Sequence, residues 1–176
     1  LLRRSLPAGD YAIIVSTSTP GTAFDLVLRF DPPTPIPLVD QCNDMTVDVS
    51  AGGMFTGMFI EVEDDYSLSC HRSTTRSYRD AAYRFTIASP KDVTITGSTT
   101  GGSWTPTTYL ALTTDCTAEA SELACRSSSS AELRQRELPA GTYYILVESS
   151  ADPPENWTLN VSITDPVPRN PGDSCS

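Results

Sequence analysis

The chain has 176 residues and a formal net charge of −10, from 12 basic and 22 acidic residues. This length suffices for one domain with a buried core, and so acidic a composition repels phosphate backbones and speaks against nucleic-acid binding. Because no stretch approaches the roughly 18 consecutive apolar residues that a spanning helix needs, we also expect no membrane span.

The opening segment of the chain returns near its end. Residues 6–15, LPAGDYAIIV, match residues 138–147, LPAGTYYILV, at an offset of 132. Residues 24–28, FDLVL, match residues 157–161, WTLNV, at an offset of 133. Matches that keep the same register indicate an internal repeat of about 133 residues.

This repeat predicts the organisation of the whole chain. One Pro-rich stretch ends at Cys42 and another ends at Cys175, again 133 residues apart. We expect the last two strands of a preceding repeat (1–31), a Pro-rich linker (32–41), one complete unit (42–165), and a second linker with the start of a following repeat (166–176). Linkers with regularly spaced prolines are extended and semi-rigid. Since two strands cannot bury an apolar face alone, residues 1–31 should pack on another copy.

Short strand-like segments separated by turn residues fill the complete unit. Residues 82–87 alternate between polar and apolar, and residues 142–148 are dense in aromatic and β-branched side chains, as in a central strand. The expected strands are 46–49, 53–62, 82–87, 93–95, 107–113, 122–126, 142–148 and 157–163. Only residues 118–123 suggest a helical turn. About eight strands predict an all-β fold, a disulfide-stapled antiparallel β-sandwich of jelly-roll type.

Five cysteines without a C-x-x-C pair favour disulfides in an oxidising compartment over a zinc site. Cys175 is the counterpart of Cys42, so its partner is expected in a following repeat, which leaves it unpaired or intermolecular here. The other four, Cys42, Cys70, Cys116 and Cys125, allow three connectivities. Because Cys116 and Cys125 flank a short loop, we favour a Cys116–Cys125 bridge together with a Cys42–Cys70 bridge.

Several segments resemble the bacterial pre-peptidase C-terminal domain, in the cysteine-containing tandem variety found in secreted and surface proteins. The resemblance rests on residues 80–87, 109–112, 138–147 and 157–161. It implies a non-catalytic, exported jelly-roll sandwich that is attached to a larger polypeptide. In some members of this family an acidic segment of the form Glu-x-Glu-x-Asn-Asp holds calcium.

Residues 61–65, EVEDD, at the end of the second expected strand form a similar acidic segment that is one residue shorter and has Asp in place of Asn. The candidate calcium ligands are Glu61, Glu63, Asp64, Asp65 and Asp80. Crowded carboxylates repel one another without a cation, and Ca²⁺ takes six to eight oxygen ligands. The alternative is a solvated acidic loop paired with the arginines between residues 72 and 79. No other cofactor is expected.

Two tryptophans and the single histidine are further candidates for a site. Trp104, beside two glycines, could contact a ligand, whereas Trp157 matches Phe24 in the repeat and is expected in the core. The single histidine, His71, follows a cysteine that is better used in a disulfide, and no G-x-S-x-G elbow occurs. We therefore expect no catalytic site.

The sequence is compatible with two functions. The first is a non-catalytic structural module, secreted or at the cell surface, that forms one unit of a stalk, adhesin shaft or filament. Its partners would be other copies of the same repeat or chain, joined through β-strand packing. The alternative is a module that binds a polysaccharide or a surface protein and targets an attached enzyme. Saturable binding that is lost on changing Trp104 would favour the alternative.

Overall fold

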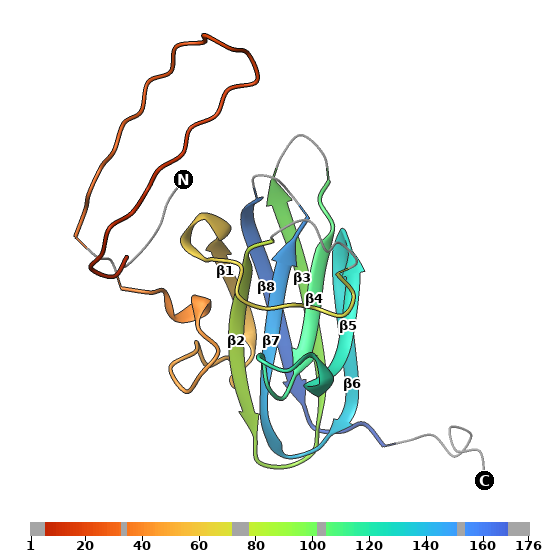
Figure 1. The fold of residues 1–176 in the computed structure, drawn as a ribbon. Coiled ribbons are helices and arrows are strands. Elements are labelled where there is room, and N and C mark those ends of the chain that lie inside the picture. Colours follow the sequence, from red (N-terminus) through yellow and green to blue (C-terminus); the bar gives the residue numbers. More distant parts are fainter. Residues whose placement is uncertain (1–5, 33–34, 72–77, 102–104, 151–153, 169–176) are drawn as a thin grey trace. The chain divides into compact units, whose positions relative to one another are not determined.

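The computed structural model describes residues 6–32, 35–71, 78–101, 105–150 and 154–168 (Figure 1). The expected contact residue Trp104 and the expected unpaired Cys175 lie outside these ranges. Tertiary contacts divide the chain into two units, Leu1–Ile36 and Pro37–Ser176. The boundary falls within the expected Pro-rich linker.

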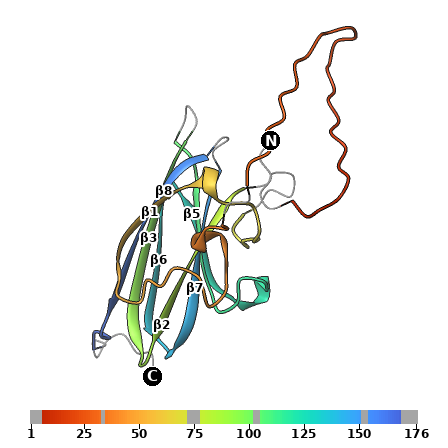
Figure 2. The ribbon, with the colours of Figure 1, turned by 90° about the vertical axis from the view of Figure 1, so that its left-hand side faces the viewer.

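The second unit is a sandwich of two four-stranded sheets that face each other (Figures 1 and 2). One sheet has the order β1-β8-β3-β6 and the other has the order β2-β7-β4-β5, with every pair antiparallel. The strands are β1 (Gly53–Met58), β2 (Asp80–Ile87), β3 (Lys91–Gly101), β4 (Thr108–Thr113), β5 (Glu122–Ser128), β6 (Ser130–Leu138), β7 (Gly141–Ser149) and β8 (Pro154–Thr164). This order is that of a jelly roll, and it confirms the predicted fold class.

Three single turns of 3-10 helix accompany the strands: η1 (Leu38–Asp40), η2 (Phe59–Glu61) and η3 (Glu119–Ser121). The last of these confirms the helical turn that was expected near residues 118–123. In the part of the chain that the structure describes, no helix has the length and apolar character to cross a membrane.

The expected strand 46–49 is wrong. Asp48 makes only an isolated parallel bridge to Arg84 of β2. The Asp48 carboxylate accepts a hydrogen bond from the backbone N–H of Ser50 (2.8 Å), which turns the chain directly after this bridge. The segment therefore leaves the sheet before a ladder can form.

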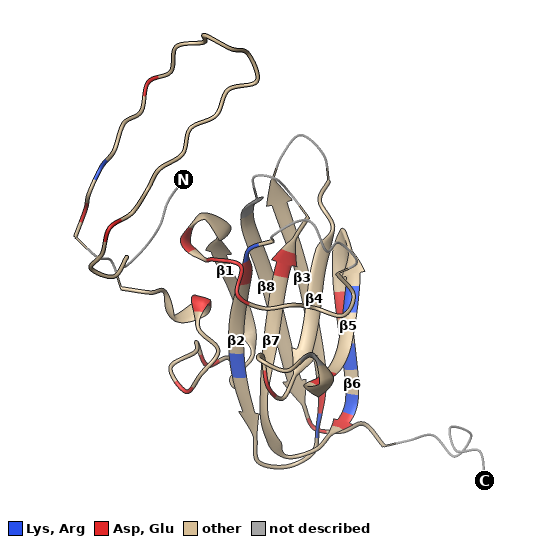
Figure 3. Cartoon of the chain, in the orientation of Figure 1, with Lys and Arg blue, Asp and Glu red and all other residues tan. Residues whose placement is uncertain are grey.

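The prediction missed β6 because its sequence, SAELRQREL, is rich in charge. Ala131 and Leu133 point into the core, while Glu132 and Arg134 alternate with them and pair with each other outside. Figure 3 shows this row of charged positions along β6. Charged side chains are common on edge strands, where they discourage pairing with other molecules. Ala131 and Leu133 do follow the two-residue period of a strand, but apolar residues are too few in β6 to stand out in the sequence.

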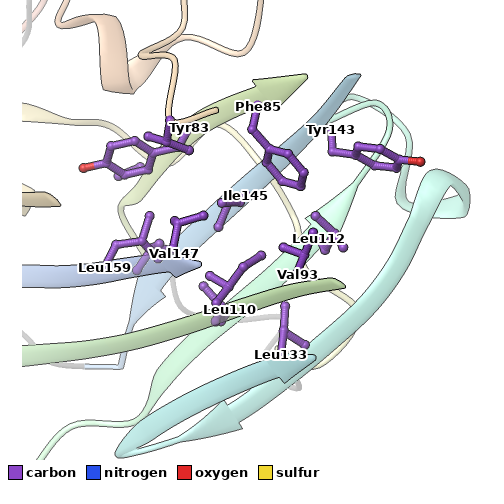
Figure 4. Packing of buried hydrophobic residues seen from close by; sticks show 14 of the residues in the cluster. Tyr83, Phe85, Val93, Leu110, Leu112, Leu133, Tyr143, Ile145, Val147 and Leu159 are labelled. Carbon is purple, nitrogen blue, oxygen red and sulfur yellow. The ribbon is translucent and has the colours of Figure 1, made fainter. Parts of the chain in front are cut away.

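The core lies between the two sheets (Figure 4). Trp157 on β8 is buried there, as expected from its match to Phe24. Its indole Nε1 donates a hydrogen bond to the Tyr83 hydroxyl (2.7 Å), and its ring meets Phe59 edge-on at 4.8 Å between centroids. Gly57 on the neighbouring strand leaves the room that this ring occupies, because a Cβ there would lie 2.1 Å from Trp157 Cζ2.

A second, smaller cluster covers the outer face of the sheet that contains β7. Its buried members are Leu68, Ala82, Ala111, Cys116 and Leu146. Leu68 belongs to residues 62–71, the described part of the connection from η2 to β2, so this part lies across the sheet and shields it from solvent. The prediction that residues 142–148 form a central strand buried on both sides is confirmed, since Ile145 faces one cluster and Leu146 faces the other.

The disulfides join Cys42 to Cys116 and Cys70 to Cys125, so the favoured pairing was wrong. The hairpin of β4 and β5 pairs Ala111 with Cys125, well inside the ladder. Cys116 lies beyond the end of β4, in the loop, and is therefore not opposite Cys125. Both bridges instead tie the connection that crosses the sheet, and the segment before it, to the β4–β5 hairpin.

In the first unit, residues 6–32 form two extended arms joined by a turn (red and orange in Figure 1). The described residues of this unit contain no strand or helix. Their apolar side chains are exposed: Leu6, Tyr11, Ile13, Ile14, Val15, Phe24, Leu26, Val27, Leu28 and Phe30. A hydrogen bond from the Thr22 N–H to the Thr19 carbonyl closes the turn. Gly21, which lies inside this turn, has a positive φ of 79°.

Candidate functional site

Buried acidic groups gather where β2 begins and β7 ends, under the connection that follows η2. Asp80, the first residue of β2, lies directly opposite Glu148 on β7. The two residues are 1% and 0% exposed. Figure 3 shows acidic positions along the covering connection and near the end of β7.

Two buried aspartates hold the covering connection in place. One carboxylate oxygen of Asp80 accepts hydrogen bonds from the backbone N–H groups of Asp65 (2.9 Å) and Tyr66 (3.1 Å). Asp40, in η1, accepts one from the N–H of Glu63 (2.7 Å). The acidic residues of this segment therefore owe their position to backbone contacts with other acidic residues.

Glu148 has a different environment. Neither of its carboxyl oxygens has a hydrogen-bond partner among the described residues, and the second oxygen of Asp80 has none either. The Nδ1 atom of His71 lies 3.3 Å from Glu148 Oε2, outside hydrogen-bonding geometry. The His71 ring stacks on Tyr78 at 4.4 Å and packs on Tyr109 at 5.2 Å between centroids. Aromatic rings thus close this acid off from water.

Burial sets the protonation of these groups. It raises the pKa of Glu148 to about 9, aided by the nearby carboxyl groups of Asp80 and Asp64. It raises the pKa of Asp80 to about 8, although the two N–H donors act in the opposite direction. It lowers the pKa of His71, against the attraction of Asp64. At neutral pH the two acids hold protons and the imidazole is neutral, so His71 and Glu148 form a neutral contact and not an ion pair.

The five expected calcium ligands do not converge. Among the described residues, no three His, Cys, Asp or Glu side chains are placed so that they could hold one metal ion together. Asp80 uses one oxygen on backbone N–H groups, and Glu61 lies in η2 at the start of the connection. The donor set as arranged does not fit calcium, which stays a prediction from the spacing of the acidic residues.

Arg79 is the arginine whose role the structure describes. Its Nη1 atom donates to the backbone carbonyls of Phe59 (2.9 Å) and Val62 (3.0 Å). In these contacts Arg79 binds backbone carbonyls at the acidic segment and not a carboxylate. Arg72 and Arg76 lie outside the described residues.

Sequence reasoning missed Glu148 and Asp40. Glu148 could have been noticed, because it is an acid at the end of residues 142–148, TYYILVE, which were expected to form a strand buried on both sides. Such a residue must be neutralised or paired. Asp40 had none, since it lies in a Pro-rich segment that reads as linker. The expectation that His71 is not a catalytic base stands untested.

No protein-family model matches the chain, and no curated protein matches it. Among solved structures, the pre-peptidase C-terminal domain of collagenase from Bacillus anthracis is similar. The similarity has 16% sequence identity, covers 66% of this chain and 93% of that chain, and has a TM-score of 0.44. The site described above rests on the contacts of this chain alone.

Proposed function

We propose that the protein is a non-catalytic extracellular module, one unit of a stalk or surface filament in which copies of the same repeat pack on one another. The observation that carries this proposal is the apolar surface of the arms. Ile13 and Leu26 are 52% and 50% exposed, whereas their counterparts in the repeat, Ile145 and Leu159, are fully buried. Apolar surface of this extent is typical of a segment that has a partner.

Contacts of the segment that follows β8 with the sandwich of the second unit also support a stalk. After β8, the Val167 N–H donates to the Asp92 carboxylate (3.0 Å), and Arg136 donates to the Val167 carbonyl (3.0 Å). Lys91 pairs with Asp165 in the same region. These contacts fix the direction in which the chain leaves the sandwich.

The entry to the sandwich is held in the same manner. Asp40 anchors the segment before the first cysteine through Glu63, and the Cys42–Cys116 bridge follows directly. A chain that is tied at entry and exit, with prolines between units, favours a rod over freely jointed domains. Two disulfides in one unit are typical of proteins outside the cytosol.

Negative-stain imaging of the native polypeptide that carries this sequence tests the proposal. We expect strings or filaments of regularly spaced particles. Isolated particles would reject a stalk. A pull-down on insoluble glycans and collagen should find no saturable binding. Saturable binding that is lost in Trp104→Ala would instead identify a targeting module.

A further inference from the structure

We propose that the two arms are the seventh and eighth strands of another sandwich, and that they enter the centre of each of its two sheets. This deepens the proposed function, on which it rests, by naming the partner. The partner is a six-stranded set that is homologous to β1–β6 of this chain and that lacks its own last two strands.

The first support is a corner that both units share. The Tyr11 hydroxyl donates a hydrogen bond to the Pro7 carbonyl over 2.8 Å, and the Tyr143 hydroxyl donates to the Pro139 carbonyl over 2.8 Å. In both places the tyrosine ring packs over the intervening glycine, so that a Cβ on Gly9 or Gly141 would meet this ring. The first arm therefore begins with the same local structure that introduces β7.

The second support is the pattern of side chains along the arms. In β7, residues on both faces are buried, and the arm keeps an apolar residue on each face, with Ile14 at the position of Leu146 and Val15 at that of Val147. In β8, the inward positions alternate with polar ones. The second arm has Phe24, Leu26 and Leu28 at the inward positions of β8, and its outward positions are polar except for Val27, which stands at the position of Asn160.

The third support is the place of these strands in the topology. β7 lies between β2 and β4 in one sheet, and β8 lies between β1 and β3 in the other. The two strands are consecutive in the chain but do not pair with each other. The described arms likewise form no ladder between them, although they are extended and joined by a short turn. This behaviour is expected of two strands made for different sheets and not of a β-hairpin.

The same topology decides the partner. The sandwich of this chain already contains β7 and β8, so a second copy could accept the arms only by expelling its own central strands. Addition to an edge would leave one face of the first arm without cover, because Ile13 and Ile14 point to opposite faces. An acceptor that lacks both strands buries all of these side chains at once.

A graft within the full chain tests the assignment. Residues 138–161 are replaced by residues 6–28, which carries the corner and both arms into the positions of β7 and β8. We expect cooperative unfolding, both disulfides, and amide exchange in the grafted strands on the order of 100-fold slower than in the same residues of the intact arms. Ser16 then takes the place of Glu148, which removes a buried acid and favours the graft.

Neighbouring substitutions supply a matched control within the graft. Leu26→Asp, at the buried position of Leu159, should abolish the protection. Val27→Asp, at the exposed position of Asn160, should preserve it. Equal effects of the two would overturn the central-strand assignment.

A second protein serves as a control in case the graft fails to fold because the arms do not fit the core of this unit. Residues 37–137 are placed before Leu6 of the chain, so that the arms follow a six-stranded set in register. Unprotected arms here, or again equal effects of Leu26→Asp and Val27→Asp, would overturn the assignment. Protected arms without filaments in the native material would uphold it and reject the stalk, whereas filaments with unprotected arms would do the reverse.

Discussion

Asp80 and Glu148 face each other across neighbouring antiparallel strands, with both carboxyl groups buried. Like charges opposite one another destabilise a sheet, and a buried charge without a partner costs more still. The pair is therefore tolerated because both groups are held in the protonated form. This makes the sandwich sensitive to pH through two buried acids.

The free energy of unfolding should fall as pH rises. Glu148 has an ordinary pKa of 4.5, raised to about 9 by burial. Its protonated form stabilises the fold fully below the lower value, and this contribution is lost as pH rises toward the upper one, by at most ~1.4 kcal/mol per pH unit. Glu148→Gln should flatten the dependence and be about 1–3 kcal/mol more stable than wild type at pH 8. Urea unfolding between pH 5 and pH 9 measures both.

Glu132→Gln is the matched control for this experiment, because Glu132 is exposed on the edge strand β6 and pairs with Arg134. It should keep the wild-type dependence on pH. Stability that rises between pH 5 and pH 9 in the wild type would show that Glu148 is ionised in the folded protein.

Each disulfide should contribute separately to stability. The bridges Cys42–Cys116 and Cys70–Cys125 close loops of sequence separation 74 and 55. Replacing either pair by serine should lower the free energy of unfolding by about 2–4 kcal/mol, because the unfolded chain gains freedom. Cys175→Ser should change it little. Peptide mapping without reduction checks the pairing, and a peptide that links Cys116 to Cys125 would contradict the structure.

Gly57 should not tolerate a larger residue. The Cβ of Gly57→Ala would overlap the Trp157 ring, at 2.1 Å from Cζ2, so β1 or the tryptophan must move. We expect a loss of about 2 kcal/mol or more and a change in tryptophan fluorescence. Gly97→Ala is the control, since its Cβ would meet Leu110 Cδ1 at an ordinary 3.5 Å. Similar losses in the two variants would argue against close packing at Trp157.

Calcium should leave the melting temperature unchanged, because the acidic residues that the structure describes are not arranged as one donor set for the ion. A ligand at a hundredfold excess over its Kd adds ~2.7 kcal/mol, which corresponds to several degrees for a domain of this size. A rise of this size in millimolar Ca²⁺, absent in Mg²⁺ and abolished by Asp80→Asn, would show instead that the acidic segment binds the ion. If the melting temperature stayed constant, the segment would be a solvated acidic loop held by Asp80 and Asp40.

Much of the fold could be predicted because its signals are local. Residues 82–87 alternate between polar and apolar, as expected for the two-residue period of a strand, and they lie in β2. Residues 142–148 are mostly apolar on both faces, as expected for a strand covered on both sides, and they lie in β7. Trp157 could be assigned to the core because the repeat places Phe24 at its position. β6 escaped because charges on its exposed face hide a pattern of the same period.

The class of the fold and the use of cysteines in disulfides could be inferred from spacing along the chain alone. Which cysteines meet, and that Asp80 lies against Glu148, became visible only in the folded structure. Both depend on the register between strands that are distant in sequence, and a shift of one residue would move every side chain to the other face. The burial that keeps Glu148 protonated comes from a connection that crosses the sheet, and no local pattern encodes that crossing.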